Sequence, residues 1–235
     1  MQSPKNASQI YQCILPLIIS LSYHLRGFIK HNSRLFMDPA YPDIDNSMFN
    51  DGAEWKEFYG DVEEAIPPDA PKPRGKQVIL RMFVDSDHAG DKATRRSRTG
   101  FIVFLNNAPI YWLSKKQTSC ETSTFGSEFV ALKQACEYVK GLRYKLRMFG
   151  IPVTEPAFVF GDNKSVLCNT TMPGSTLKKK SNAIAFHFVR EGCAKDEWRT
   201  AYVNTHLNPA DLMTKPLSGE KRWGFVRMLL RHICG

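Results

Sequence analysis

The sequence predicts an α/β fold in which a mixed five-stranded sheet is flanked by helices. Three observations support this prediction. Short β-prone runs alternate with longer helical segments from about residue 77 to residue 217, two of the runs are separated only by a hairpin signal, and acidic residues follow several of the runs. Strands that alternate with helices are typical of a sheet covered by helices, so residues 77–217 are expected to form one domain.

The length and charge of the chain set limits on its organisation. With 235 residues it can form one domain with an appendage, or two small domains. The formal charge of +9 is uneven: residues 1–75 carry 7 Lys/Arg and 10 Asp/Glu, whereas residues 76–235 carry 25 and 13. The basic C-terminal part predicts a polyanionic partner, although a well-solvated surface gives the same count.

The cysteines and the apolar N-terminal segment indicate the compartment. The six cysteines form no CxxC pair and no zinc-like spacing, which predicts reduced thiols in an intracellular protein. The segment from Ile10 to Leu25 is shorter than the roughly 20 apolar residues that span a bilayer. It also lacks the basic start and the cleavage site of a signal peptide. We therefore expect an amphipathic helix, at about Ser8 to Ile29, and no membrane association.

Two segments precede the predicted sheet. Residues 1–60 form a helical and irregular appendage that is too short to bury a core of its own. Four prolines within the ten residues Ile66–Gly75 predict a stiff, extended linker. We assign residues 61–76 to this linker and place the domain boundary near residue 76.

The first strand of the domain ends in acidic residues. The apolar run from Val78 to Val84 is followed directly by Asp85, Ser86 and Asp87. An ionised aspartate beside a buried strand is costly unless it is paired, hydrogen-bonded or bound to a cation. The alternative is that both aspartates cap the turn that Gly90 completes.

A hairpin and a long helix come next. Runs at 99–105 and 109–113 are joined by a hairpin signal, and a helix capped by Ser123 or Thr124 extends to Gly150. Glu128 lies in its first turn, either to hold a carboxylate at the sheet or to interact with the helix dipole. The residues expected to face the core keep a spacing of three or four: Phe129, Leu132, Cys136, Val139, Leu142, Leu146 and Phe149.

The last strands also deliver acidic residues. The strand Ala157–Phe160 leads to Asp162, which either lies at a ligand site at the sheet end or caps the helix that begins at Lys164. A helix over 181–194 and a strand over 198–204 follow, and Asp211 is expected in the first turn of a short helix. Residues 218–235 contain a final amphipathic helix, with one side formed by Trp223, Val226, Leu229 and Leu230.

These elements place four carboxylates near one sheet: Asp85, Glu128, Asp162 and Asp211. Four negative charges that converge on one site repel each other strongly unless cations are present. Two divalent metal ions would remove this repulsion.

Six motifs, in this order, resemble the ribonuclease H domain of copia-type LTR retrotransposon polyproteins over about residues 77–217: FVDSDHAGDKATRRSRTG, PIYWLSKKQ, STFGSEFVAL, FGDNKSV, FHFVRE and NPADLMTKPL. The resemblance implies a ribonuclease H-like fold whose first three strands are antiparallel. An upstream stretch, SRLFMDPAYPDID, resembles the end of the reverse transcriptase or connection region, so residues 1–60 are expected to be a remnant of that region. No polymerase catalytic motif is found.

The resemblance also implies roles for single residues. Asp85 matches the first catalytic aspartate, which bridges two metal ions, and Glu128, Asp162 and Asp211 match the other metal ligands. The implied cofactor is a pair of Mg²⁺ ions, with Mn²⁺ as an alternative, because all ligands are hard oxygens. His206 occupies a place like that of a loop histidine that assists proton transfer or product departure, although an exposed histidine without a role fits equally.

The implied substrate is an RNA–DNA hybrid. Such a duplex is bound through phosphates and 2′-hydroxyl groups, so recognition follows its shape and depends on salt. The candidate contacts, each of which can instead be a plain surface charge, are Arg95, Arg96, Arg98, Lys115, Lys116, Lys178, Lys179 and Arg190.

The function predicted from the sequence is metal-dependent cleavage of the RNA strand of hybrids during reverse transcription. An inactive nucleic-acid-binding or assembly remnant is the alternative, and an integrase or resolvase on a similar fold fits less well. The reverse transcriptase part of the same polyprotein is an expected partner. The expected location is the cytoplasm, in a virus-like particle, or the nucleus.

Overall fold

A computed structural model describes residues 53–106, 108–177 and 182–229 of the chain. The helix expected near residues 8–29 and most of the expected connection remnant lie outside the described residues. So do Lys178 and Lys179, two of the predicted nucleic-acid contacts.

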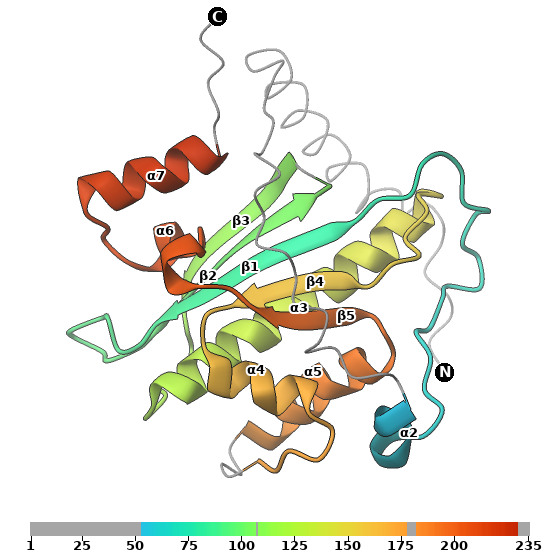
Figure 1. The fold of residues 1–235 in the computed structure, drawn as a ribbon, viewed down its shortest axis with the longest axis horizontal. Helices are drawn as coiled ribbons and strands as arrows, with labels where there is room; N and C mark the ends of the chain where they lie inside the picture. Colours follow the sequence, from blue (N-terminus) through green and yellow to red (C-terminus); the bar gives the residue numbers. More distant parts are fainter. Residues whose placement is uncertain (1–52, 107, 178–181, 230–235) are drawn as a thin grey trace, which may run out of the picture.

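The core of the molecule is a five-stranded mixed sheet with the strand order β3-β2-β1-β4-β5 (Figure 1). Strand β1 is antiparallel to β2 and parallel to β4; β2 and β3 are antiparallel, and β4 and β5 are parallel. The predicted fold class, with the first three strands antiparallel and helices around the sheet, is confirmed. The strands are β1 (Leu80–Asp87), β2 (Arg98–Leu105), β3 (Ala108–Lys116), β4 (Ala157–Gly161) and β5 (Trp198–Tyr202).

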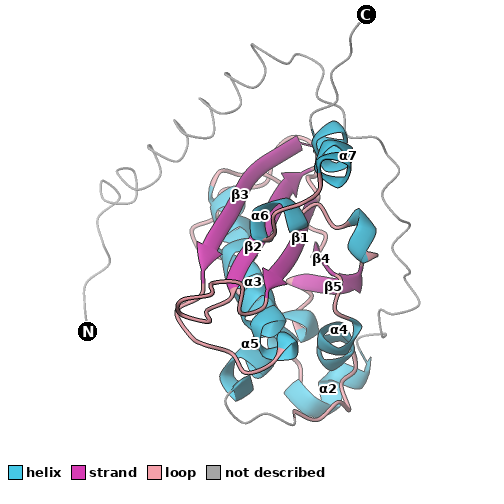
Figure 2. Cartoon of the chain, turned by 90° about the vertical axis from the view of Figure 1, so that its left-hand side faces the viewer, coloured by secondary structure: helices cyan, strands magenta, loops and turns pink. Residues whose placement is uncertain are grey.

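Helices pack on both faces of this sheet. The described helices are α2 (Ala53–Tyr59), α3 (Thr124–Met148), α4 (Lys164–Thr171), α5 (Ala183–Ala194), a 3-10 turn (Thr205–Leu207), α6 (Asp211–Thr214) and α7 (Gly219–Leu229). Helix α3 passes behind the sheet in Figure 1 and α6 lies in front of it. In the perpendicular view, α2, α4 and α5 gather at one end of the molecule and α7 lies at the other (Figure 2).

The alternation of side chains along β1 separates two cores. Met82 and Val84 point to the core shared with α3 and α5, whereas Phe83 points to a second cluster that includes Ala210 beside α6. Asp85 therefore leaves the strand on the same face as Phe83, on the side of α6.

The long helix α3 begins as predicted. Its N-cap is Ser123, whose hydroxyl accepts a hydrogen bond from the Gly126 amide at 3.1 Å. The predicted apolar stripe is buried except for Phe149, which is 38% exposed because it is the C-cap residue beyond the last turn. Glu128 is the fifth residue of α3, so it lies just past the first turn in which it was predicted.

The apolar side of α7 differs from the prediction. Phe225 is buried, whereas Trp223 is 58% exposed. Residues two positions apart on a helix are separated by about 200° around its axis, so the side chains of Trp223 and Phe225 point in nearly opposite directions. The prediction is therefore wrong for Trp223, and the buried side contains Phe225 instead. Leu229, another residue of the predicted side, does pack against the second core cluster.

The segment that precedes β1 lies against the domain. Glu64, within the predicted linker, is paired with Arg143 and Arg147 of α3. The Arg74 amide donates a hydrogen bond to the Gly150 carbonyl at 2.8 Å, and Trp55 of α2 is buried. The boundary near residue 76 stays a prediction, but this segment contacts the domain on both sides of its prolines.

Within the residues that the structure describes, no helix is both long enough and apolar enough to cross a membrane.

Candidate active site at the end of the central strand

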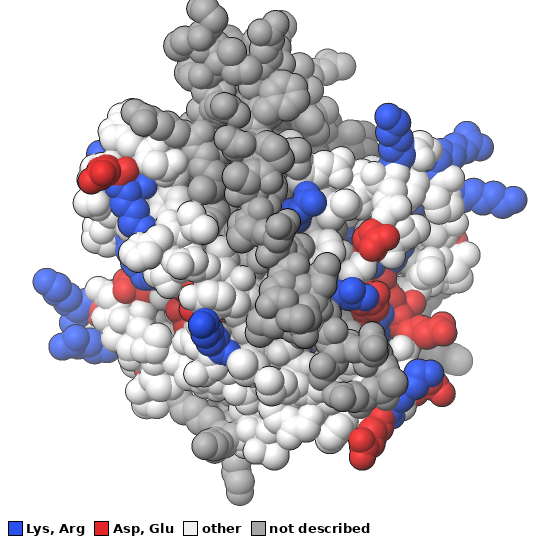
Figure 3. Space-filling view, in the orientation of Figure 1, with Lys and Arg blue, Asp and Glu red and all other residues white. Residues whose placement is uncertain are grey.

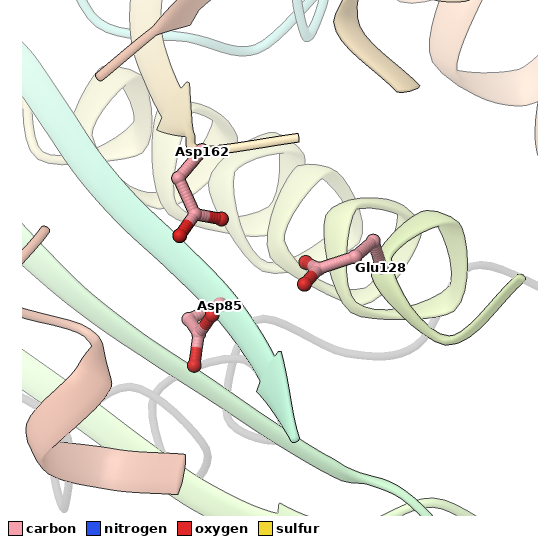
Figure 4. A group of neighbouring side chains, drawn as sticks. All are labelled: Asp85, Glu128 and Asp162. Atoms are coloured by element: carbon pink, nitrogen blue, oxygen red, sulfur yellow. The ribbon is translucent and has the colours of Figure 1, made fainter. Parts of the chain in front are cut away.

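Three of the four predicted carboxylates meet at one point. Asp85 comes from β1, Glu128 from α3 and Asp162 from the residue after β4, and Figure 4 shows their side chains pointing toward one another. One carboxylate oxygen from each residue lies within 4.8 Å of the others. Strand β1 and its parallel neighbour β4 both end here, so the sheet itself brings two of the three acids together.

Asp85 is completely buried and its carboxylate is held by the segment around α6. Its Oδ2 accepts a hydrogen bond from the Thr214 hydroxyl, and its Oδ1 accepts one from the Lys215 ammonium at 3.0 Å. Burial raises the pKa of Asp85 above its ordinary value, because Lys215 and Thr214 offset the loss of water only in part. The Asp87 side chain lies instead beside Gly90, and its turn-forming role stays a prediction.

The start of α3, which carries Glu128, is attached to the sheet through the neighbouring Ser127. The Ser86 hydroxyl donates to the Ser127 hydroxyl at 3.0 Å, and the Gln117 amide donates to the Ser127 carbonyl at 2.9 Å. These bonds attach the start of α3 to β1 and to the end of β3. Burial, followed by the nearby charges of Asp85 and Asp162, raises the pKa of Glu128 to about 9.

The Asp162 side chain joins the carboxylate cluster, and its neighbour Asn163 caps the next helix instead. Asn163 is the N-cap of α4, and its Oδ1 accepts a hydrogen bond from the Val166 amide at 3.2 Å. The alternative role of Asp162 as a helix cap is therefore wrong, because the cap falls one residue later.

Asp211, the fourth predicted acid, is linked to the cluster through a lysine. Asp211 begins α6 and is buried. Its Oδ1 accepts a hydrogen bond from Lys215 at 2.9 Å, and its Oδ2 accepts one from Lys221 of α7 at 2.6 Å. Since Lys215 also contacts Asp85, its ammonium group lies between the two aspartates.

A glycine in β2 allows α6 to approach the sheet closely. A Cβ atom on Gly100 would lie 2.5 Å from Thr214 Cγ2 and 2.7 Å from Met213 Cβ. Gly100 is paired with Asp85 across the two strands. The missing side chain therefore makes room for the helix that carries Asp211 and Lys215 beside Asp85. The loop before α6 is held by Asn208, whose amide donates to the Val84 carbonyl at 2.9 Å.

The donor set fits a divalent cation. Three carboxylates supply hard oxygen ligands of the kind that Mg²⁺ and Mn²⁺ prefer. Burial first, and then the charges of Asp85 and Asp162, raise the pKa of Glu128, and a bound cation would oppose both effects. Lys215 already provides one positive charge at Asp85, which shows that this position accepts a cation.

Basic residues lie beyond Asp85 on the neighbouring strands β2 and β3 and in the loop between β1 and β2. Asp87, two residues after Asp85 on β1, is paired with Arg98 on β2, and Arg98 is paired with Lys116 on β3. Lys115 and Lys116 are exposed on β3, and Arg95 and Arg96 are exposed in the β1–β2 loop. Basic side chains project at the left edge of Figure 3, where this loop lies in Figure 1.

The other candidates lie apart from the cluster. The Arg190 side chain is buried: its guanidinium donates to the Ser175 carbonyl at 2.8 Å and lies over the rings of Phe186 and Trp55. Its surroundings are those of a residue that supports the fold. His206 is exposed on the 3-10 turn Thr205–Leu207, where its amide donates to the Asn204 side chain at 2.9 Å.

Comparisons with known proteins agree with the resemblance seen in the sequence. No family model matches the chain. The retrovirus-related Pol polyprotein from transposon RE1 of Arabidopsis thaliana is 32% identical over 145 residues, which cover 62% of this chain and 10% of that protein. The polyprotein from transposon RE2 of the same plant is 30% identical over 156 residues, which cover 66% of this chain and 11% of that protein. The chain is a homologue of one segment of retrovirus-related Pol polyproteins. It spans about a tenth of the length of these curated relatives.

Among solved structures, the ribonuclease H1 of Halobacterium salinarum matches with a TM-score of 0.45 and 16% sequence identity. The match covers 57% of this chain and 93% of that protein.

Three site residues of this Pol polyprotein homologue were not predicted from its sequence: Thr214, Lys215 and Lys221. Lys215 follows Asp211 by four residues, a spacing that places two side chains on the same side of a helix. That spacing could have predicted the contact between Lys215 and Asp211. The contact of Lys221 depends on how α7 folds back toward α6, for which the sequence holds no local signal.

Proposed function

We propose that this chain carries a metal-dependent ribonuclease H that hydrolyses the RNA strand of RNA–DNA hybrids during retrotransposon reverse transcription. The observation that carries the proposal is the convergence of Asp85, Glu128 and Asp162, with Asp211 linked to them through Lys215. The homology to Pol polyproteins supports the same activity.

The proposed cofactor is a pair of divalent ions, Mg²⁺ or alternatively Mn²⁺. Asp85, Glu128 and Asp162 would hold one ion, and Asp85 together with Asp211 would hold the other. When bound, such ions lower the pKa of the attacking water and stabilise the leaving 3′ oxygen. The chain contributes the buried carboxylates of Asp85, Glu128 and Asp211 and the half-buried one of Asp162. Carboxylates that are already in place limit the reorganisation needed when charge develops in the reaction.

The proposed substrate contacts follow the two neighbouring strands and their loop. Arg98, Lys115 and Lys116 lie at the end of the hairpin, and Arg95 and Arg96 extend from the loop before it. Strands lie about 4.8 Å apart, so a duplex whose cleaved bond lies at Asp85 would pass within reach of these side chains. His206 stays a candidate for proton transfer or product departure, because it is exposed on the loop before Asp211.

The activity test uses the full chain, a hybrid labelled on its RNA strand, and Mg²⁺. We expect cleavage of the hybrid RNA and little cleavage of double-stranded DNA. The Asp85→Asn variant should be inactive, because it removes a shared ligand while keeping the size of the side chain.

Two results would contradict the nuclease proposal. One is a folded parent protein, verified by circular dichroism, that does not cut the hybrid at any Mg²⁺ or Mn²⁺ concentration. The other is equal cleavage by the parent and by Asp85→Asn. Tight hybrid binding without cleavage would support the alternative, an inactive nucleic-acid-binding module.

We further propose an intracellular location, in cytoplasmic particles or in the nucleus, with the reverse transcriptase part of the polyprotein as a partner. The four described cysteines are free thiols, as is usual in a reducing compartment.

A further inference from the structure

We propose that Lys215 is a built-in cation at the Asp85–Asp211 pair, so that a divalent ion binds this pair only by displacing the lysine. The inference rests on the proposed function, because it treats the same carboxylates as metal ligands. It adds that the two ion positions are unequal, and that one side chain of this protein sets the difference.

The geometry places a single ammonium group between two buried carboxylates. Lys215 Nζ lies 3.0 Å from Asp85 Oδ1 and 2.9 Å from Asp211 Oδ1. The side chains of the two aspartates are 0% and 1% exposed. An ammonium group has three hydrogen-bond donors and no acceptor, and this one donates to both carboxylates. Lys215 therefore places a positive charge between the two aspartates.

The position among Asp85, Glu128 and Asp162 has fewer contacts with Lys215 than the Asp85–Asp211 pair has. Among the described residues, Lys215 donates hydrogen bonds to Asp85 and Asp211, and to neither Glu128 nor Asp162. Asp85 belongs to both positions, so a cation among Asp85, Glu128 and Asp162 would share Asp85 with Lys215. It would meet Glu128 and Asp162 without breaking an ion pair of those two residues. At Asp85 and Asp211, a cation must first replace the ammonium group.

The lysine is suited to leave because its side chain is not enclosed. The Lys215 side chain is 34% exposed, although both of its partners are buried. A flexible four-carbon stem with a strongly hydrated head can move to water at a lower cost than a guanidinium held in a fork. Lys221 stays on Asp211 Oδ2 at 2.6 Å, so this aspartate keeps one positive partner after Lys215 moves.

The test measures Mn²⁺ binding to the full chain, without nucleic acid, by electron paramagnetic resonance of the free ion. The parent protein should bind two ions whose dissociation constants differ by at least about tenfold, because one ion competes with a charge at contact distance. In Lys215→Met, the weaker site should tighten by at least about tenfold, and the stronger site should change much less.

Two lysines serve as matched controls. Lys221→Met removes the same charge from the same aspartate but leaves the ammonium group between Asp85 and Asp211, so its effect on the weaker site should be much smaller. Lys195→Met breaks a pair with Glu191 that has the same spacing of four residues on another helix, and it should leave both sites unchanged.

Lys215→Arg keeps the charge and should keep the second site weak. If Lys215→Met does not fold without metal, Mn²⁺ should restore its circular dichroism spectrum, because the ion replaces the missing charge. Failure of this restoration would overturn the proposal. So would equal tightening by Lys215→Met and Lys221→Met, because that result indicates a general charge effect.

The binding measurement is independent of catalysis. If the parent protein binds two Mn²⁺ ions with unequal affinities and Lys215→Met tightens the weaker site, but the protein does not cut hybrids, this result would contradict the proposed function alone. Cleavage of hybrids by a protein whose ion binding is unchanged in Lys215→Met would contradict this inference alone.

Discussion

Glu64, in the segment before β1, forms a two-point ion pair with the buried Arg143 of α3. Glu64 Oε1 accepts from Arg143 Nε at 2.9 Å, and Oε2 accepts from Nη2 at 2.6 Å. The remaining Nη1 donates to the Glu155 carbonyl at 2.6 Å, and the Arg143 side chain is only 1% exposed. The buried guanidinium therefore depends on a carboxylate that lies outside the predicted domain of residues 77–217.

Replacing Glu64 with Gln should destabilise the fold. The substitution leaves the Arg143 charge buried without its counter-ion, and breaking a buried ion pair typically costs about 3–5 kcal/mol. Since Glu64 is partly open to water, we expect about 2–3 kcal/mol in urea unfolding. As the control, Asp61→Asn breaks a fully exposed pair with Lys56 and should leave the free energy of unfolding nearly unchanged. Equal stability of the two variants would show that Glu64 is not part of the folded unit.

The metal-free protein should lose stability as the pH rises. Burial and the charges of Asp85 and Asp162 raise the pKa of Glu128 from 4.5 to about 9 in the folded protein. Between these values the folded state holds a proton that the unfolded state has released, so rising pH favours unfolding. The contribution is complete below about pH 4.5 and is lost as the pH passes 9. Unfolding in EDTA across this range should show the decline.

Glu128→Gln should weaken this dependence, because glutamine cannot release a proton in this range. Saturating Mg²⁺ should weaken it in the parent protein as well, because a bound divalent cation favours the charged carboxylate. An unchanged pH slope in the variant would show that another group titrates.

The close packing of α6 on β2 should not tolerate a methyl group at Gly100. Its Cβ would lie 2.5 Å from Thr214 Cγ2, so α6 must move. We expect Gly100→Ala to cost about 1–3 kcal/mol of stability and to weaken metal binding, since the same helix carries Asp211 and Lys215. Gly141→Ala is the matched control: no atom lies within 4 Å of its Cβ, and alanine in a helix interior should add about 0.5–1 kcal/mol. Metal affinity of Gly100→Ala equal to that of the parent would contradict this role of the glycine.

The sequence predicted the site residues that strand and helix periodicity can locate. Asp85 and Asp162 follow apolar strands, and Glu128 adjoins the apolar stripe of a capped helix, so local patterns place all three near one end of the sheet. The positions of Lys215 and Lys221 depend on the path of the chain after β5, where α6 crosses the sheet and α7 folds back. Contacts between such distant segments are set by tertiary packing, which leaves no local period in the sequence.

Arg190 was predicted to contact nucleic acid for the same reason: its buried position depends on a distant segment. It lies in the motif FHFVRE, which contains basic and aromatic residues. Its sequence context suggests a surface charge, yet the side chain lies under Trp55 of α2, more than a hundred residues earlier in the chain. A pairing of this kind between an arginine and a remote tryptophan follows from how α2 docks on α5.

Arg190 and Lys115 should therefore respond differently in hybrid binding. Arg190 donates to the Pro173 and Ser175 carbonyls from a buried position, so Arg190→Ala should cost about 2–4 kcal/mol of stability. Lys115 is exposed on β3, and Lys115→Ala should leave stability unchanged within about 0.5 kcal/mol. Binding is measured in the Asp85→Asn background, which prevents cleavage during the titration. There, Lys115→Ala should reduce the slope of log K against log salt by about 1, because one phosphate contact is lost. Folded Arg190→Ala protein should keep the parent slope, and a reduced slope would place Arg190 among the phosphate contacts.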